Sequence, residues 1–124
     1  MTREEMKART KRYANRVLKV CAALPKDWIA RVLGAQLLRS GTSVGANYRA
    51  VCRAKSKADF LNKLKIVEEE CDESLFWMEL LIENGFFRLS RLQSLLREGD
   101  EILSIIVASA KTTRGSKELE NRKS

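Results

Sequence analysis

The sequence predicts an all-α protein, an antiparallel up-down-up-down four-helix bundle, on three observations. The chain of 124 residues contains only one Pro and six Gly, so few residues interrupt a helix. Apolar residues recur at helical spacing in four separate stretches. Short segments join these stretches, and short connections make consecutive helices antiparallel. We expect one domain over residues 1–112, with helices near 3–24, 27–53, 57–84 and 90–111, and a disordered polar tail over 113–124.

The first predicted helix is apolar on one side and basic on the other. Its apolar positions include Met6, Tyr13, Val17 and Leu24, and Pro25 prevents its continuation. Two interpretations of the basic side stay open, a solvated helix face and a surface that contacts nucleic-acid phosphates. The basic side consists of Lys7, Lys11, Arg12, Arg16 and Lys19.

The second predicted helix begins after Asp27, a good N-cap, and crosses a stretch of loop-forming residues. The apolar spacing continues through that stretch, at Leu33, Leu37, Gly41, Val44, Tyr48 and Val51, so we predict unbroken helix. Gly41 and Gly45 then lie one turn apart and let a neighbouring helix pack closely. A phosphate-binding loop is disfavoured, because such a loop follows a strand and ends in Lys-Ser or Lys-Thr. Trp28 is either a core residue or a subunit contact.

The turn into the third helix is a candidate anion site. Ser56 can cap that helix together with Asp59, and helix N-termini present free amide groups to anions. The basic residues of this turn are Arg49, Arg53, Lys55 and Lys57.

The third predicted helix has more apolar surface than a lone bundle needs. One stripe runs from Phe60 to Ile82, and a second, aromatic-rich strip lies beside it. We expect this surplus to form an interface between subunits. Asn84 and Gly85 end the helix, with Phe86 making a C-terminal contact. The second strip consists of Leu61, Phe76, Trp77, Leu80 and Leu81.

An acidic run on the same helix does not predict an enzyme. Metal sites in helix bundles use Glu-x-x-His, and the chain contains no His. No nucleophile has an adjacent base. We therefore expect no catalysis, no metal and no cofactor, and we expect these carboxylates to pair with Arg or Lys of the first two helices. The run consists of Glu68, Glu69, Glu70, Asp72 and Glu73.

The fourth predicted helix starts at Ser90, with Gln93 completing a capping box.

Over the whole chain the net charge is +8, and it is distributed unevenly. Residues 1–57 hold fourteen basic and three acidic side chains, whereas residues 58–85 hold two and eight. The sequence has no apolar run of membrane-spanning length and a charged N-terminus, so we expect a cytoplasmic protein with no membrane partner. The three widely spaced Cys suit a reducing compartment.

The middle third of the chain resembles a known family. The residues that match are Gln36, Leu37, Ser43, Val44, Ala46, Asn47, Asp59, Phe60, Leu64 and Glu73. They resemble small bacterial four-helix-bundle proteins, including those encoded in intervening sequences of 23S rRNA genes and, more distantly, the accessory proteins of diversity-generating retroelements. Where many relatives have Glu-Gly after the motif Asn, this chain has Tyr48 and Arg49. The resemblance implies a homopentamer.

These observations lead to two functional hypotheses. The first is a non-enzymatic, basic oligomer that binds RNA or DNA through phosphates, and the retroelement resemblance implies an accessory factor for RNA or a reverse transcriptase. The alternative is an oligomeric protein-interaction scaffold that does not bind nucleic acid. The predicted nucleic-acid contacts are Lys11, Arg12, Arg16, Lys19, Arg49, Arg53, Lys55 and Lys57. The predicted oligomer contacts are Leu61, Phe76, Trp77 and Leu80.

Overall fold

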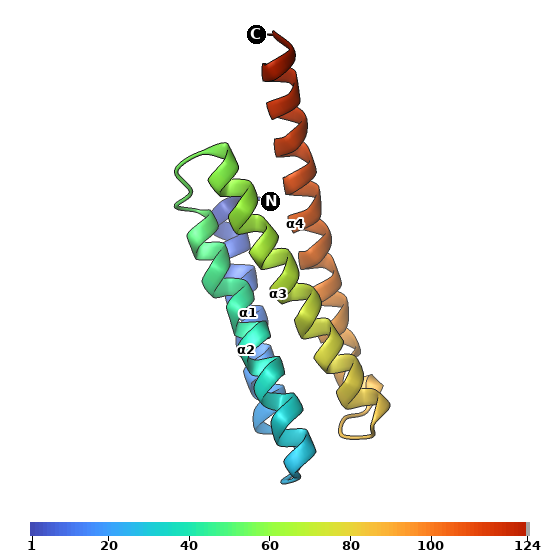
Figure 1. Ribbon diagram of the computed structural model, residues 1–124. Helices are drawn as coiled ribbons and strands as arrows, with labels where there is room; N and C mark the ends of the chain where they lie inside the picture. The colour runs from blue at the N-terminus through green and yellow to red at the C-terminus, as the bar shows by residue number, and fades with distance from the viewer. Residues whose placement is uncertain (124) are drawn as a thin grey trace.

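The computed structural model describes the backbone of residues 1–123 and the side chains of residues 1–115. Four helices account for nearly all of this, and no strand occurs among the described residues. Consecutive helices run in opposite directions (Figure 1), so the predicted all-α class and helix order are confirmed. The helices are α1 (Arg3–Ala22), α2 (Trp28–Val51), α3 (Lys57–Glu83) and α4 (Leu89–Lys123).

Local capping residues explain where most helices begin and end. The Asp27 carboxylate accepts from the amides of Ile29 and Ala30 at the start of α2, as predicted. At the end of α3, Gly85 has a φ of +77°, and the Phe86 amide donates to the Leu81 carbonyl at 2.9 Å. This is the hydrogen bond of a Schellman C-cap, so the predicted stop at Gly85 is confirmed.

The fourth helix differs from the prediction at both ends. It begins at Leu89, so Ser90 lies inside the helix rather than at its N-cap. It continues to Lys123, well past the predicted end near residue 111, so the predicted disordered tail is wrong up to that residue, and residue 124 lies outside the described part. Apolar periodicity reports burial rather than helicity, and this segment has no Pro to stop a helix. In Figure 1 the end of α4 projects beyond the other three helices.

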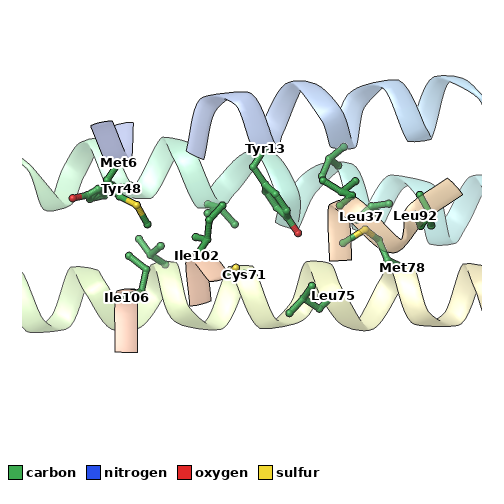
Figure 2. Close-up of a cluster of buried hydrophobic side chains, with 14 of the residues drawn as sticks. Met6, Tyr13, Leu37, Tyr48, Cys71, Leu75, Met78, Leu92, Ile102 and Ile106 are labelled. Atoms are coloured by element: carbon green, nitrogen blue, oxygen red, sulfur yellow. The ribbon is translucent and has the colours of Figure 1, made fainter. Parts of the chain in front are cut away.

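All four helices contribute side chains to one apolar core (Figure 2). Tyr13, Leu37, Met78 and Ile102 are fully buried within it. A buried polar contact lies inside this core, where Tyr13 Oη is 2.8 Å from Ser74 Oγ. Ser74 Oγ donates to the Cys71 carbonyl, so Tyr13 is the donor to Ser74. The buried polar groups of the core are thus satisfied.

The glycines of α2 lie against α1. A Cβ built on Gly41 would be 2.7 Å from a methyl carbon of Val17, and one built on Gly45 would be 3.2 Å from the Thr10 carbonyl oxygen. Both distances are shorter than an ordinary carbon contact. The two helices therefore approach each other as closely as glycine allows. The predicted close packing at Gly41 and Gly45 is confirmed.

Candidate nucleic-acid interface

Two arginines, Arg9 and Arg39, form ion pairs between helices. Neither is among the predicted nucleic-acid contacts. Arg9 on α1 donates to both carboxylate oxygens of Glu98 on α4, at 2.8 and 2.6 Å, and also to Glu101. The hydrogen bonds from Arg9 lower the pKa of Glu98. This fork is partly buried, which makes it stronger than an ordinary surface pair.

Arg39 on α2 makes the corresponding link to α3. Its guanidinium contacts Glu70 at 3.2 Å and Glu73 at 2.5 Å, and the Glu73 hydrogen bond raises the pKa of Arg39. Glu73 also accepts from the Trp77 indole at 3.2 Å. The expectation that the acidic run pairs with a basic residue of the first two helices is therefore confirmed for Glu70 and Glu73.

The predicted basic residues form three groups rather than one stripe. Lys11 and Arg49 line a groove of about 440 Å³ on the outer side of the α1–α2 pair. Arg16 instead faces α4, where it donates to Ser94 Oγ at 2.9 Å. Five residues of helix place Lys11 and Arg16 about 140° apart on the circumference of α1, so these two side chains cannot contact one surface.

The second group consists of Arg12, Arg16 and Lys19 on α1. Arg12 and Lys19 are exposed, and neither has an ion-pair partner within the part of the chain whose side chains are described. The charges of Arg12 and Arg16 both lower the pKa of Glu98. This group therefore lies beside the Arg9 ion pair but keeps most of its charge toward solvent.

The third group lies at the α2–α3 turn and consists of Arg53, Lys55 and Lys57. Lys55 and Lys57 line a hollow of about 350 Å³ together with Arg3 and Phe60, and the Arg3 guanidinium lies 5.6 Å from the centre of the Phe60 ring. Two of the backbone amides at this turn are already occupied by the protein's own side chains. Ser56 Oγ accepts from the Asp59 amide, and the Asp59 carboxylate accepts from the Lys55 amide at 3.0 Å. The turn is basic, but its helix N-terminus is capped by the protein itself.

The predicted interface residues of α3 do not form a single strip. Phe76 is half exposed, whereas Leu61 and Trp77 are half buried and pack against the core. Sixteen residues of helix place Leu61 and Trp77 about 160° apart on α3. Leu81 is fully buried in the core. The exposed part of the predicted strip is therefore Phe76, with the partly buried Leu80 one turn away.

The comparisons with known proteins agree with the fold and its sequence motif. The family model described as 23S rRNA-intervening sequence protein matches residues 4–108. The chain belongs to this family. A crystal structure of a Bacteroides thetaiotaomicron protein, described as of unknown function and from the S23 ribosomal protein family, is 33% identical. The match covers 90% of this chain and 99% of that one, with a TM-score of 0.83. No curated protein matches the chain.

Within this family fold, the motif residues have structural roles. Asn47 donates to the Ser43 carbonyl at 2.8 Å, Asp59 pairs with Lys63 at 2.6 Å, and Glu73 holds Arg39. The family motif thus stabilises the α2–α3 pair and its connection.

The described side chains contain no group of three or more potential metal ligands. No described helix is long and apolar enough to cross a membrane.

Sequence reasoning missed Arg9 and Arg39 as the residues that pair between helices. The sequence does contain a signal for Arg39. The carboxylates of the acidic run require cationic partners, and Arg39 is a cation that lies among the residues of the family motif. No local signal existed for Arg9, since its partner Glu98 is 89 residues away in the chain. Membership of the family gives the helix order but not these pairings.

Proposed function

We propose that the protein is a non-enzymatic oligomer, a homopentamer as the family resemblance implies, that binds RNA through its phosphates. One observation supports this function most directly. The interhelical ion pairs of the described side chains use Arg9 and Arg39, so Arg12, Lys19 and Arg53 keep unpaired, exposed charges. Exposed cations that do not stabilise their own fold remain available for a polyanion.

The family name supports RNA as the nucleic acid. The matching family model is described by the 23S rRNA-intervening sequence, which relates these proteins to an RNA gene without stating what they bind. Phosphate contacts with little base readout suit this chain, because its two Tyr are buried in the core and unavailable for stacking. The role as an accessory factor for a reverse transcriptase stays a prediction.

The experiment is binding of a fluorescent structured RNA, measured by anisotropy across a salt series. We expect a steep decrease of affinity with salt, because each phosphate contact releases counterions. Charge reversal at Arg12, Arg16 and Lys19 together should weaken binding at least about tenfold at 150 mM salt and flatten the salt dependence. A triple Gln variant provides the same test with a smaller disturbance next to Glu98.

The matched control reverses three cations that belong to none of the three groups, two on α4 and one directly before it. The variant Arg88→Glu, Arg97→Glu, Lys111→Glu has the same net charge as the α1 variant, and all three positions are exposed. It should bind RNA more tightly than the α1 variant. Equal losses in the two variants, or undiminished binding in the α1 variant, would contradict the assignment of these residues.

The scaffold alternative has one observation in its favour. Lys11 and Arg49 line a groove between helices, a shape that suits a protein segment as well as a phosphate. Weak RNA binding with a flat salt dependence from an intact oligomer would support the scaffold.

A further inference from the structure

A groove runs along the outer side of the α1–α2 pair, and small side chains form its floor. The hollow that contains Lys11 and Arg49 is otherwise lined mainly by Ala8, Ala14, Thr42, Gly45 and Ala46. A second hollow of about 520 Å³ follows along the same two helices, lined in part by Cys21, Gly34, Ala35 and Leu38. Because few of these side chains project far from the backbone, the groove can admit the side chains of another helix.

The groove is apolar along its middle and basic at both ends. Leu38 is 37% exposed and Leu18, on the facing helix, is 50% exposed. Lys11 and Arg49 lie at one end, and Lys26 and Arg31 line the hollow at the other. Two carboxylates are also present, but Glu4 lies 3.7 Å from Lys7 and Asp27 is used as the N-cap of α2. An occupant should therefore combine an apolar ridge with acidic flanks.

The protein itself has a ridge of this chemistry on the outer side of α3. Phe76 is 50% exposed at its centre, and Leu80 follows one turn later. At 100° per residue, the other members lie within about 60° of Phe76 around the helix. The four acidic members are exposed, and none has a partner among the described side chains. The ridge consists of Glu69, Asp72, Phe76, Glu79, Leu80 and Glu83.

We propose that the acidic ridge of α3 in one copy docks in the α1–α2 groove of a second copy. This inference specifies the contact by which the proposed oligomer forms. The groove and the ridge differ in shape and in charge and lie on different helices, so each copy offers one of each. Such a contact is head-to-tail rather than two-fold symmetric, and repeating it builds a closed ring or a filament.

The contact would cover some of the predicted nucleic-acid residues and leave others accessible. Lys11 and Arg49 lie in the groove, so the second copy covers them. Arg12 and Arg16 are on the side of α1 that faces α4 and stay outside this contact. RNA binding by the assembled protein should therefore depend on the second group and not on Lys11 or Arg49.

The experiment uses two complementary variants and no nucleic acid. The groove variant is Lys11→Glu with Arg49→Glu, and the ridge variant is Phe76→Asp. Each variant keeps one competent face, so each alone should be a monomer near 14.1 kDa. Mixed in equal amounts, the intact ridge of the first should dock in the intact groove of the second. The mixture should give a 1:1 heterodimer and nothing larger, because the two remaining faces are both damaged.

Native mass spectrometry and light scattering give the masses, and circular dichroism checks that each variant is folded. Arg88→Glu with Arg97→Glu is the charge-matched control, which should keep the mass of the unaltered protein. Ala46→Trp is a second groove variant that fills the floor without changing charge, and it should behave like the first. The proposal is overturned if the unaltered protein is a monomer, if either damaged variant keeps the oligomer mass, or if the mixture forms no heterodimer.

The outcome is independent of RNA binding. If the heterodimer forms and RNA does not bind, the contact stands and the nucleic-acid function fails. If RNA binds but the heterodimer does not form, the reverse holds.

Discussion

Replacing Gly41 by Ala tests how tightly α1 packs on α2. The new methyl carbon would lie 2.7 and 2.8 Å from the two methyl carbons of Val17 and 3.1 Å from its Cβ, whereas carbon atoms prefer about 3.5–4.0 Å. Val17 is fully buried and β-branched, so it cannot rotate away. Overpacking of this kind costs about 1–3 kcal/mol, and the upper value applies because α1 itself must move. Ala gains about 1 kcal/mol of helix propensity, so we expect a net loss of about 2 kcal/mol in the free energy of unfolding.

Urea unfolding followed by circular dichroism measures this loss, at one protein concentration because association affects stability. Gly115→Ala is the control for helix propensity, since nothing lies within 4 Å of its new carbon, and it should not lose stability. In the double variant with Val17→Ala, the two closest contacts are removed and only the 3.1 Å contact to the Cβ of residue 17 is left, so the two changes should couple by about 1–3 kcal/mol. A Gly41→Ala protein as stable as the original, or additive effects in the double variant, would refute the close packing of the two helices.

Two further predictions concern the ion pair of Arg9 with Glu98 and the turn at Gly85. Arg9→Gln should lose about 1–2 kcal/mol of stability at pH 7, because Glu98 loses its charged hydrogen-bond partner. Since Arg9 lowers the pKa of Glu98, this stabilisation is present above the carboxyl's unfolded pKa and is lost as pH falls through the lowered folded value. Urea unfolding at pH 7 and pH 3 should therefore show a difference between the two proteins that shrinks at pH 3; a constant difference would contradict it. Gly85→Ala should cost about 1 kcal/mol, seen as a lower thermal midpoint, because φ is +77° there and glycine alone adopts this backbone without strain. An unchanged midpoint would argue against the Schellman cap.

Local chemistry made much of the fold predictable. Asp27, Ser56 and Gly85 act on backbone groups within a few residues, so their effect is visible in sequence. The helical assignment of the Gly41 region succeeded because the apolar spacing of α2 continues through it. The end of α4 was mispredicted for the opposite reason, since its last turns leave the bundle and show no apolar spacing although they are helical.

The candidate site was less predictable, because its geometry depends on which helix lies beside which. Spacing along α1 identifies Lys11 and Arg16 as non-core residues, but only the packed structure shows that one faces the α2 groove and the other faces α4. The same holds for Phe76 and Leu61, which appear in one strip of the sequence and differ in exposure once the helices pack, because Leu61 lies against the core and Phe76 does not.

The seam between α1 and α4 differs from the other three neighbouring seams of the bundle. These two helices touch least, since α1 packs chiefly on α2 and α4 on α3, and hydrogen bonds from Arg9 to Glu98 and from Arg16 to Ser94 cross this seam. The molecule is thus two helical hairpins that pack together mainly along α2 and α3. Amide groups next to the α1–α4 seam should exchange with solvent through a partial opening that leaves the α2–α3 contact intact. Acid that protonates Glu98 should weaken the Arg9 ion pair and so make this opening more frequent.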